Sequence, residues 1–268
     1  MDMKAKVIVT RPAREAERWV KELSARGLHA QALPLIEIAP PLDLAALRQA
    51  RERLADNAHA YAAVMWVSPN AVSGFWGDGA SDRLLEIRRI AAGTRAWSPG
   101  PGTTQALQRA GWPVSGIDAP APDAPQFDSE SLWEQVKPQL LPGRRILIVR
   151  GANAQGQVAG RDWLAKQLRA AGLAVEEVAA YRRIRPSLDA GGLLLARAGA
   201  RGDGVWLFSS SEAVANLVEL LPECDWSGGR AIATHPRIAE AARQAGFGYV
   251  IETHPTLQAV AASIESIA

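Results

Sequence analysis

Residues 65–76 read MWVSPNAVSGFW, and residues 206–217 read WLFSSSEAVANL. Each stretch has an apolar run, a serine, one or two further polar residues, and then Ala-Val at the start of a helical pattern. A short apolar run followed by helical periodicity predicts a strand, a turn and a helix. The chain therefore contains the same strand–turn–helix unit twice, about 140 residues apart.

The similarity between the two halves extends beyond these stretches. KVIVTRP followed by residues 19–40 matches RILIVRG followed by residues 163–186. Further along, ALQRAGWPV at 106–114 matches AARQAGFGYV at 241–250. A repeat of this length exceeds a solenoid unit, so we interpret it as two homologous domains.

Each half alternates β-rich runs with helical periodicity. After VIV at 7–9, four apolar residues recur at helical spacing: Ala16, Trp19, Val20 and Leu23. Gly27 is suited to end that helix. Strands that alternate with helices indicate parallel β-α-β units. The sequence therefore predicts an α/β protein with two doubly wound parallel-sheet lobes, and DAPAPDAPQF at 118–127 is expected to be a surface loop.

Composition limits the classes of function. The chain has 268 residues, 48% of them hydrophobic, enough for one large domain or two ordinary ones. A net charge of +2 without a basic block argues against nucleic-acid binding. The single cysteine, Cys224, excludes an internal disulfide. Neither a signal peptide nor an 18-residue apolar run is seen, so we expect a cytoplasmic protein without membrane association.

Hydroxyl residues mark the expected junctions between strands and helices. They occur in Thr10-Arg11-Pro12, Ser68-Pro69, Gly100-Pro101-Gly102-Thr103-Thr104 and Thr234-His235-Pro236. A Ser or Thr N-cap with a nearby proline is a common helix start, and its free N–H groups favour anions. Doubly wound sheets bind ligands at such carboxyl ends of strands. The junctions are therefore either parts of an anion site or helix caps alone.

Common cofactor and metal motifs do not occur in the sequence. GPGTTQ at 100–105 lacks the third glycine of a nicotinamide-binding loop, and there is no GxxxxGK[ST]. The four histidines lack metal-ligand spacing. Without GxSxG, Ser68 and residues 209–211 are interpreted as hydrogen-bond donors, not nucleophiles. We expect neither a cofactor nor a metal.

Several further motifs occur in order along nearly the whole chain: VTRP, LPLIEI (33–38), Ser-Pro-Asn-Ala-Val, GPGT (100–103), DSESL (128–132), ILIVRG (146–151), VAAYRR (178–183) and the FSS strand end. Together they resemble the uroporphyrinogen-III synthase family. The resemblance implies flavodoxin-like lobes around a cleft, joined by linker strands at about 34–40 and 179–186. It implies a discontinuous first lobe, 1–36 plus 184–268, and a second lobe at 37–183. Periodicity alone also allows a simple tandem pair.

The resemblance also implies a substrate and a reaction. The substrate would be hydroxymethylbilane, a linear tetrapyrrole with eight carboxylates, and the product would be uroporphyrinogen III. Ring A would lose its hydroxymethyl oxygen as water, and ring D would be inverted as the macrocycle closes, without a cofactor or metal. Anion donors in both lobes suit this substrate, and catalysis would consist mainly of holding a flexible chain in one geometry.

By the same resemblance, Tyr181 in VAAYRR is the candidate general acid at the departing hydroxyl. The alternative is a strand tyrosine that packs on the linker. The matching substrate-binding positions are Thr10, Arg11, Ser68, Thr103, Arg150, Gly151, Ser209 and Ser210. The chain departs from the family pattern at 234–237, where Thr234-His235-Pro236-Arg237 stands in place of a glycine-rich turn with a threonine. Either Arg237 provides a charged contact there in place of the hydroxyl, or this lobe binds the substrate less tightly.

Two other classes of function are compatible with the sequence. A bilobal binding or sensing protein would share this fold without turnover, although no DNA-binding segment accompanies it. A glycosyl-transfer enzyme would also have twin lobes. The family resemblance further predicts a monomer whose partners are its small-molecule substrate and, transiently, the upstream hydroxymethylbilane synthase.

Overall fold

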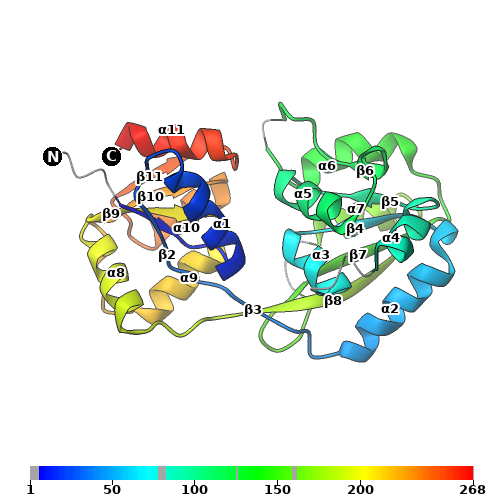
Figure 1. The fold of residues 1–268 in the computed structure, drawn as a ribbon, viewed down its shortest axis with the longest axis horizontal. Coiled ribbons are helices and arrows are strands. Elements are labelled where there is room, and N and C mark those ends of the chain that lie inside the picture. Colours follow the sequence, from blue (N-terminus) through cyan, green and yellow to red (C-terminus); the bar gives the residue numbers. More distant parts are fainter. Residues whose placement is uncertain (1–5, 78–82, 125, 159–161, 268) are drawn as a thin grey trace. The chain divides into compact units, whose positions relative to one another are not determined.

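The chain forms two compact units in the computed structural model, which describes residues 6–77, 83–124, 126–158 and 162–267. Unit 1 comprises Met1–Glu37 together with Ile184–Ala268, and unit 2 comprises Ile38–Arg183 (Figure 1). The chain therefore leaves unit 1 after Glu37 and returns to it after Arg183.

The described residues of unit 1 form a five-stranded parallel sheet in the order β11-β10-β9-β1-β2. Its strands are β1 (Lys6–Val9), β2 (Ala30–Ala32), β9 (Gly204–Phe208), β10 (Arg230–Ala233) and β11 (Tyr249–Glu252). Its helices are α1 (Ala13–Ser24), α8 (Ala190–Ala200), α9 (Ser211–Leu220), α10 (Pro236–Gln244) and α11 (Leu257–Ile267). Strand order reverses between β1 and β9, which is the topological switch point of a doubly wound sheet.

Unit 2 contains a six-stranded sheet in the order β3-β8-β7-β4-β5-β6. Its strands are β3 (Glu37–Ala39), β4 (Tyr61–Trp66), β5 (Arg95–Trp97), β6 (Ile117–Asp118), β7 (Arg145–Ala152) and β8 (Ala174–Ile184). Its helices are α2 (Leu44–Asp56), α3 (Pro69–Trp76), α4 (Leu84–Ala91), α5 (Pro101–Ala110), α6 (Ser129–Val136) and α7 (Trp163–Ala170). From β8 to β6 the pairing is parallel, so the predicted parallel α/β fold is confirmed.

The two sheets share one strand order, but the chain enters them at different points. Strands β1, β2, β9, β10 and β11 of unit 1 correspond in position to β7, β8, β4, β5 and β6 of unit 2. Both orders read 2-1-3-4-5 when counted from β1 or from β7, as in flavodoxin-like folds. Unit 2 is therefore a circular permutation of unit 1, with β3 added beside β8.

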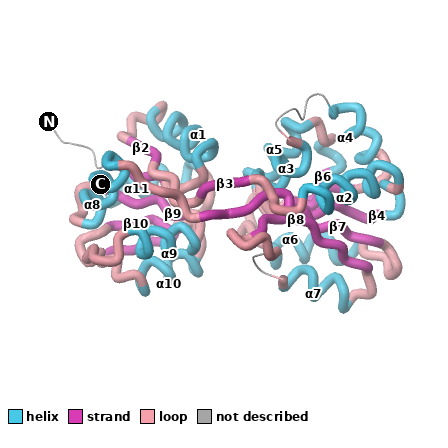
Figure 2. Tube along the Cα trace, turned by 90° about the horizontal axis from the view of Figure 1, so that it is seen from below, coloured by secondary structure: helices cyan, strands magenta, loops and turns pink. Residues whose placement is uncertain are grey.

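Apolar periodicity places helices on both faces of each sheet. In unit 1, the buried residues Ala16, Trp19 and Leu23 of α1 pack on Val7 and Val9 of β1. In unit 2, α6 and α7 cover one face of the sheet, and α3, α4 and α5 cover the other (Figure 2). Gly27 adopts a φ of 78° just after α1 and ends that helix as predicted.

The two strands at which the chain passes from one unit to the other, β3 and β8, differ in extent from the sequence prediction. We expected strands at about 34–40 and 179–186, whereas β3 covers only Glu37–Ala39 and β8 runs from Ala174 to Ile184. Prolines account for several of these ends, because a residue without an N–H cannot donate to the ladder. Pro34 and Pro40 flank β3, and Pro186 lies two residues beyond β8. The early start of β8 reflects its pairing with β7 from Arg145↔Ala174 onward.

Candidate active site

The switch point of unit 2 lies between β4 and β7, and most of the predicted residues of this unit lie at its carboxyl end. Ser68 follows β4, and Arg150 and Gly151 lie near the end of β7. Tyr181 belongs to β8, whose register places it opposite Gly151. The fold therefore brings four predicted residues from three neighbouring strands to one edge of the sheet.

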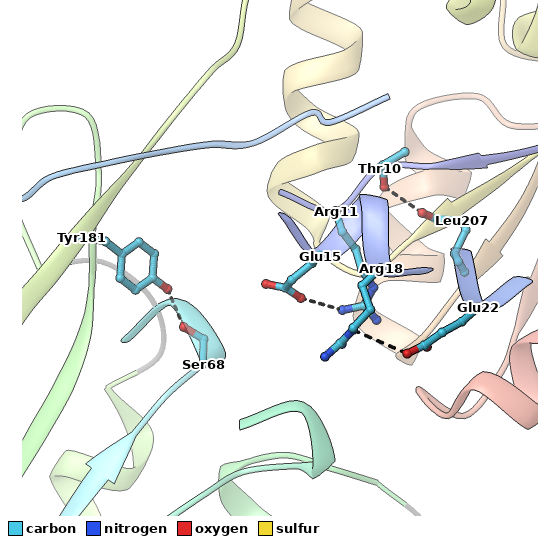
Figure 3. A network of polar contacts seen from close by, with 8 residues as sticks. All are labelled: Thr10, Arg11, Glu15, Arg18, Glu22, Ser68, Tyr181 and Leu207. Atoms are coloured by element: carbon cyan, nitrogen blue, oxygen red, sulfur yellow. Dashed lines mark hydrogen bonds and ion pairs between the residues drawn. The ribbon is translucent and has the colours of Figure 1, made fainter. Parts of the chain in front are cut away.

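The hydroxyl groups of Ser68 and Tyr181 form a hydrogen bond, with 3.0 Å between Ser68 Oγ and Tyr181 Oη (Figure 3). Ser68 is the N-cap of α3, and its Oγ accepts the N–H of Ala71 at 3.1 Å. A serine hydroxyl has one proton and two acceptor sites. When Ser68 donates that proton to Tyr181 Oη, the phenolic proton is left for another acceptor. This arrangement would let Tyr181 act as a proton donor.

The ring of Tyr181 occupies the space above Gly151. The tyrosine is only 4% exposed. A Cβ atom added at Gly151 would lie 2.7 Å from Cζ of the ring and 3.0 Å from its hydroxyl oxygen. Gly151 was predicted as a substrate-binding residue, and in the structure its nearest neighbour is the phenol.

The side chain of Arg150 forms an ion pair with Glu177 within unit 2. Its side chain is 6% exposed, and Nη1 donates to Glu177 Oε2 at 2.7 Å. Glu177 also accepts a hydrogen bond from Arg169 at 2.9 Å. Burial alone would raise the pKa of the Glu177 carboxyl, but the two arginines outweigh burial and lower that pKa. This contact gives Arg150 a structural role beside its predicted role in substrate binding, which stays a prediction.

In unit 1, Thr10 and Arg11 follow β1. The hydroxyl of Thr10 donates to the carbonyl of Leu207 at 2.7 Å and is buried (Figure 3). Arg11 pairs with Glu15 at 3.2 Å and lies over the ring of Trp19, with Cζ 4.5 Å from the ring centroid. Burial lowers the pKa of the Arg11 guanidinium, and the neighbouring Glu15 opposes that change. Arg11 is therefore held in one orientation before any ligand binds.

Two of the expected threonine caps were wrong. Thr10 does not cap α1, because Pro12 occupies the N-cap position and makes no side-chain cap. Thr234 is buried, and His235 caps α10 by accepting the N–H of Arg237 at Nδ1, 3.1 Å away. In both segments the residue immediately before the first helical residue occupies the N-cap position, and the threonine lies too early.

The serines after β9 divide between two roles. Ser210 caps α9 and accepts the N–H of Glu212 at 3.2 Å. The hydroxyl oxygen of Ser209 is buried and has no hydrogen-bond partner among the described residues. A buried hydroxyl without a partner is uncommon and is costly unless a ligand or water satisfies it. Ser209 therefore keeps its predicted status as a ligand contact in unit 1.

At the GPGT segment, hydroxyl groups other than that of Thr103 hold the loop, and substrate binding by Thr103 stays a prediction. Thr103 is buried in the first turn of α5, whose N-cap is Gly100. Ser98, fully buried, donates to the carbonyl of Gly100 and accepts from the hydroxyl of Thr104 at 2.9 Å. These bonds fix the loop internally. The sequence signal for Ser98 was its position after the apolar strand RAW, which resembles the position of Ser68 after MWV.

Among the residues that the structure describes, no cluster of three His, Cys, Asp or Glu side chains could hold a metal ion. Within the same residues, no helix is both long and apolar enough to cross a membrane.

These features define a doubly wound α/β protein in which each unit has hydroxyl groups and an arginine at the carboxyl ends of its own central parallel strands. A family model described as uroporphyrinogen-III synthase HemD matches residues 17–262. Because this match covers most of the chain and parts of both units, the chain belongs to the uroporphyrinogen-III synthase family.

Individual relatives agree with this assignment. A uroporphyrinogen-III synthase of Synechococcus elongatus is 28% identical over 232 residues, which cover 82% of this chain and 77% of that protein. A crystal structure of a mutant uroporphyrinogen III synthase from Thermus thermophilus has a TM-score of 0.56 at 17% identity, covering 98% of this chain and 97% of that one. The Helicobacter pylori uroporphyrinogen-III synthetase has a TM-score of 0.58 at 15% identity, covering 98% and 100%. At these identities the two structures support the fold.

Proposed function

We propose that the chain is a lyase that converts hydroxymethylbilane into uroporphyrinogen III and water, with inversion of ring D. The observation that carries this proposal is the family match over residues 17–262, which includes parts of both units. Action in the cytoplasm, as a monomer and without a cofactor, belongs to the same proposal. So does a transient contact with the upstream hydroxymethylbilane synthase.

In the proposed reaction, the bond between carbon and oxygen in the ring A hydroxymethyl group breaks, and the oxygen leaves as water. Tyr181 donates a proton to the departing hydroxyl, which then leaves as water. The Ser68 hydroxyl, 3.0 Å from Tyr181 Oη, stabilises the phenolate that remains by donating a hydrogen bond to it. Ring D then attacks the azafulvene through its substituted carbon, and the resulting spiro intermediate fragments and recloses. The proton released as the macrocycle closes restores the phenol.

Most of the proposed rate enhancement comes from positioning. A substrate with eight carboxylates needs several fixed donors, and each unit has donors at the ends of its own strands. Arg11 is already oriented by Glu15 and Trp19, so its binding of a carboxylate would cost little side-chain entropy. The partnerless Ser209 hydroxyl is a second donor suited to a ligand.

The test uses purified protein and freshly made hydroxymethylbilane. Products are oxidised to porphyrins, and the type I and type III isomers are separated. We expect type III to dominate, whereas heat-denatured protein should give the spontaneous type I isomer. Binding of the substrate without any change in isomer ratio would instead support the bilobal binding protein.

A further inference from the structure

Helix α3 lies unusually close to strand β8 within unit 2. A Cβ atom added at Gly74, in the middle of α3, would lie 2.3 Å from the carbonyl oxygen of Ala180. Cβ atoms in proteins essentially never come within 3.0 Å of such an atom. Only glycine therefore permits this spacing between the helix and the strand. Ala180 directly precedes Tyr181, and Ser68 caps the same helix.

The corresponding place in unit 1 is built differently. Matching the serine caps and the Ala-Val pairs without a gap puts Asn216 of α9 at the position of Gly74. The Nδ2 group of Asn216 donates to the carbonyl of Leu35 at 2.7 Å, and Leu35 corresponds to Ala180. In unit 1 an amide side chain connects α9 to the segment between β2 and β3, whereas in unit 2 the backbones of α3 and β8 meet directly.

Gly151 provides the second part of the arrangement. Its added Cβ would lie 2.7 Å from Cζ and 2.8 Å from Cε2 of Tyr181, so any side chain there would displace the ring. The corresponding position in unit 1 is Pro12, and Ile36 occupies the position of Tyr181. Unit 1 thus has a larger residue at each of the two glycine positions, and it has an isoleucine where unit 2 has the phenol of Tyr181.

We infer that Gly74 and Gly151 are positioning residues, which together place the hydroxyl of Tyr181 against Ser68. Gly74 sets the distance between α3 and β8, and Gly151 leaves the space in which the ring lies. This positioning role of Gly151 is separate from the substrate contact predicted for it, which stays a prediction. The catalytic consequence of this inference rests on the proposed function, in which Tyr181 is the proton donor.

Two variants test the inference, and a third serves as their control. Gly151→Ala pushes directly on the ring. Gly74→Asn copies unit 1, where Asn216 donates to the corresponding carbonyl, that of Leu35, so this variant is expected to fold with α3 further from β8. The control is Gly93→Ala in the same unit, where the added Cβ would make ordinary contacts of 3.5 Å with His59.

The first measurement does not depend on activity. The chain contains three tyrosines, so labelling with [¹³Cζ]tyrosine gives three NMR signals, and Tyr181→Phe identifies one of them. We expect Gly151→Ala and Gly74→Asn to shift the Tyr181 signal and leave those of Tyr61 and Tyr249 in place. Gly93→Ala should shift none. An unchanged Tyr181 signal in both test variants would overturn the inference.

The second measurement is the isomer assay with kinetics. We expect both variants to lower kcat by about 10–100-fold, the lower range of general acid assistance, with KM within about twofold of wild type. The share of type I isomer should rise. In a Tyr181→Phe background the Gly74→Asn change should add little further loss. A shifted signal with unchanged kcat and isomer ratio would also overturn the positioning role. Failure of the wild type to form type III would refute the proposed function, while the NMR signals would still report on the position of Tyr181.

Discussion

Units 1 and 2 share a strand order, yet they have different side chains at corresponding positions of their switch points. Unit 2 has Tyr181 hydrogen-bonded to the serine cap of α3, whereas unit 1 has Ile36 at the sequence position that corresponds to Tyr181. Unit 1 instead has the buried hydroxyl of Ser209, for which the described part of the chain provides no hydrogen-bond partner. The same fold therefore presents different groups in its two copies: a phenol in unit 2, which we propose as the proton donor, and a buried serine hydroxyl in unit 1, which we propose as a binding group.

The corresponding arginines show the same divergence. Arg11 pairs with Glu15 of its own helix and with the ring of Trp19. Arg150 pairs instead with Glu177 of the neighbouring strand, and unit 1 has Ala32 at that strand position. An arginine that is oriented by its own helix can bind a ligand without disturbing the sheet. An arginine that bridges two strands cannot be removed without cost to the fold.

The largest expected effect comes from Arg150→Ala. Removing one partner of a largely buried ion pair typically costs about 3–5 kcal/mol, and we expect about 3 kcal/mol because Arg169 still neutralises Glu177. Arg11→Ala should cost about 1 kcal/mol and should raise KM more than it lowers kcat, increasingly so at low salt. Urea denaturation followed by tryptophan fluorescence measures the stability of both variants. An equal loss in the two variants would remove the distinction between the arginines.

Tyr181→Phe tests the chemical difference between the units. The variant keeps the ring and deletes the proton donor, so we expect kcat to fall by about 10–100-fold with little change in KM. More type I isomer should form through the uncatalysed route. Tyr249→Phe, which changes an exposed tyrosine of unit 1, is the matched control. Wild-type rate and isomer ratio in Tyr181→Phe would make Tyr181 a packing residue.

Variants of the two serine caps, Ser68 and Ser210, distinguish an effect on folding stability from an effect on catalysis. Ser68→Ala and Ser210→Ala each remove an N-cap, so each should cost about 1 kcal/mol of folding free energy. Only Ser68→Ala also removes the hydrogen bond to Tyr181, so this variant should increase the share of type I isomer more than Ser210→Ala does. If both variants changed the isomer ratio to the same extent, the phenol contact would have no special role.

The smallest expected effect is a dependence of stability on pH in unit 2. The pKa of Glu177 is lowered in the folded state, so its ionised form stabilises the fold. That contribution is present above the unfolded pKa of about 4.3 and is lost as pH falls through the folded pKa. The stability difference between wild type and Glu177→Gln should therefore shrink below about pH 4. Thermal unfolding from pH 3 to 7 measures this difference, with Glu17→Gln as the control for net charge. A constant difference over that range would contradict the assignment.

Local patterns in the sequence were sufficient to predict the parallel α/β fold and the cap at Ser68. The apolar run MWV, the serine and the following Ala-Val pair all belong to one strand–turn–helix unit, so neighbouring residues determine it. The caps at Thr10 and Thr234 were wrong because a change of one or two residues in where a helix begins decides which side chain reaches its N–H groups.

Contacts between distant segments could not be predicted in this way. The pairing of Arg150 with Glu177 and the contact of Gly74 with Ala180 depend on strand register and on the distance between a helix and a strand. The sequence contained only a weak indication of the contact between Gly74 and Ala180. Gly74 is a glycine inside an otherwise apolar helical pattern, which indicates a packing reason without naming the partner.

The permuted strand order also affects the order in which the protein can fold during synthesis. Unit 2 is continuous from Ile38 to Arg183 and can close its sheet soon after it leaves the ribosome. Strand β1 must wait for β9, because Thr10 and its partner Leu207 are 197 residues apart. At about 5–20 residues per second, β1 spends roughly 10–40 s without its central neighbour. An apolar strand with an unpaired edge is prone to aggregation, so unit 1 is the part of the nascent chain most in need of chaperone protection.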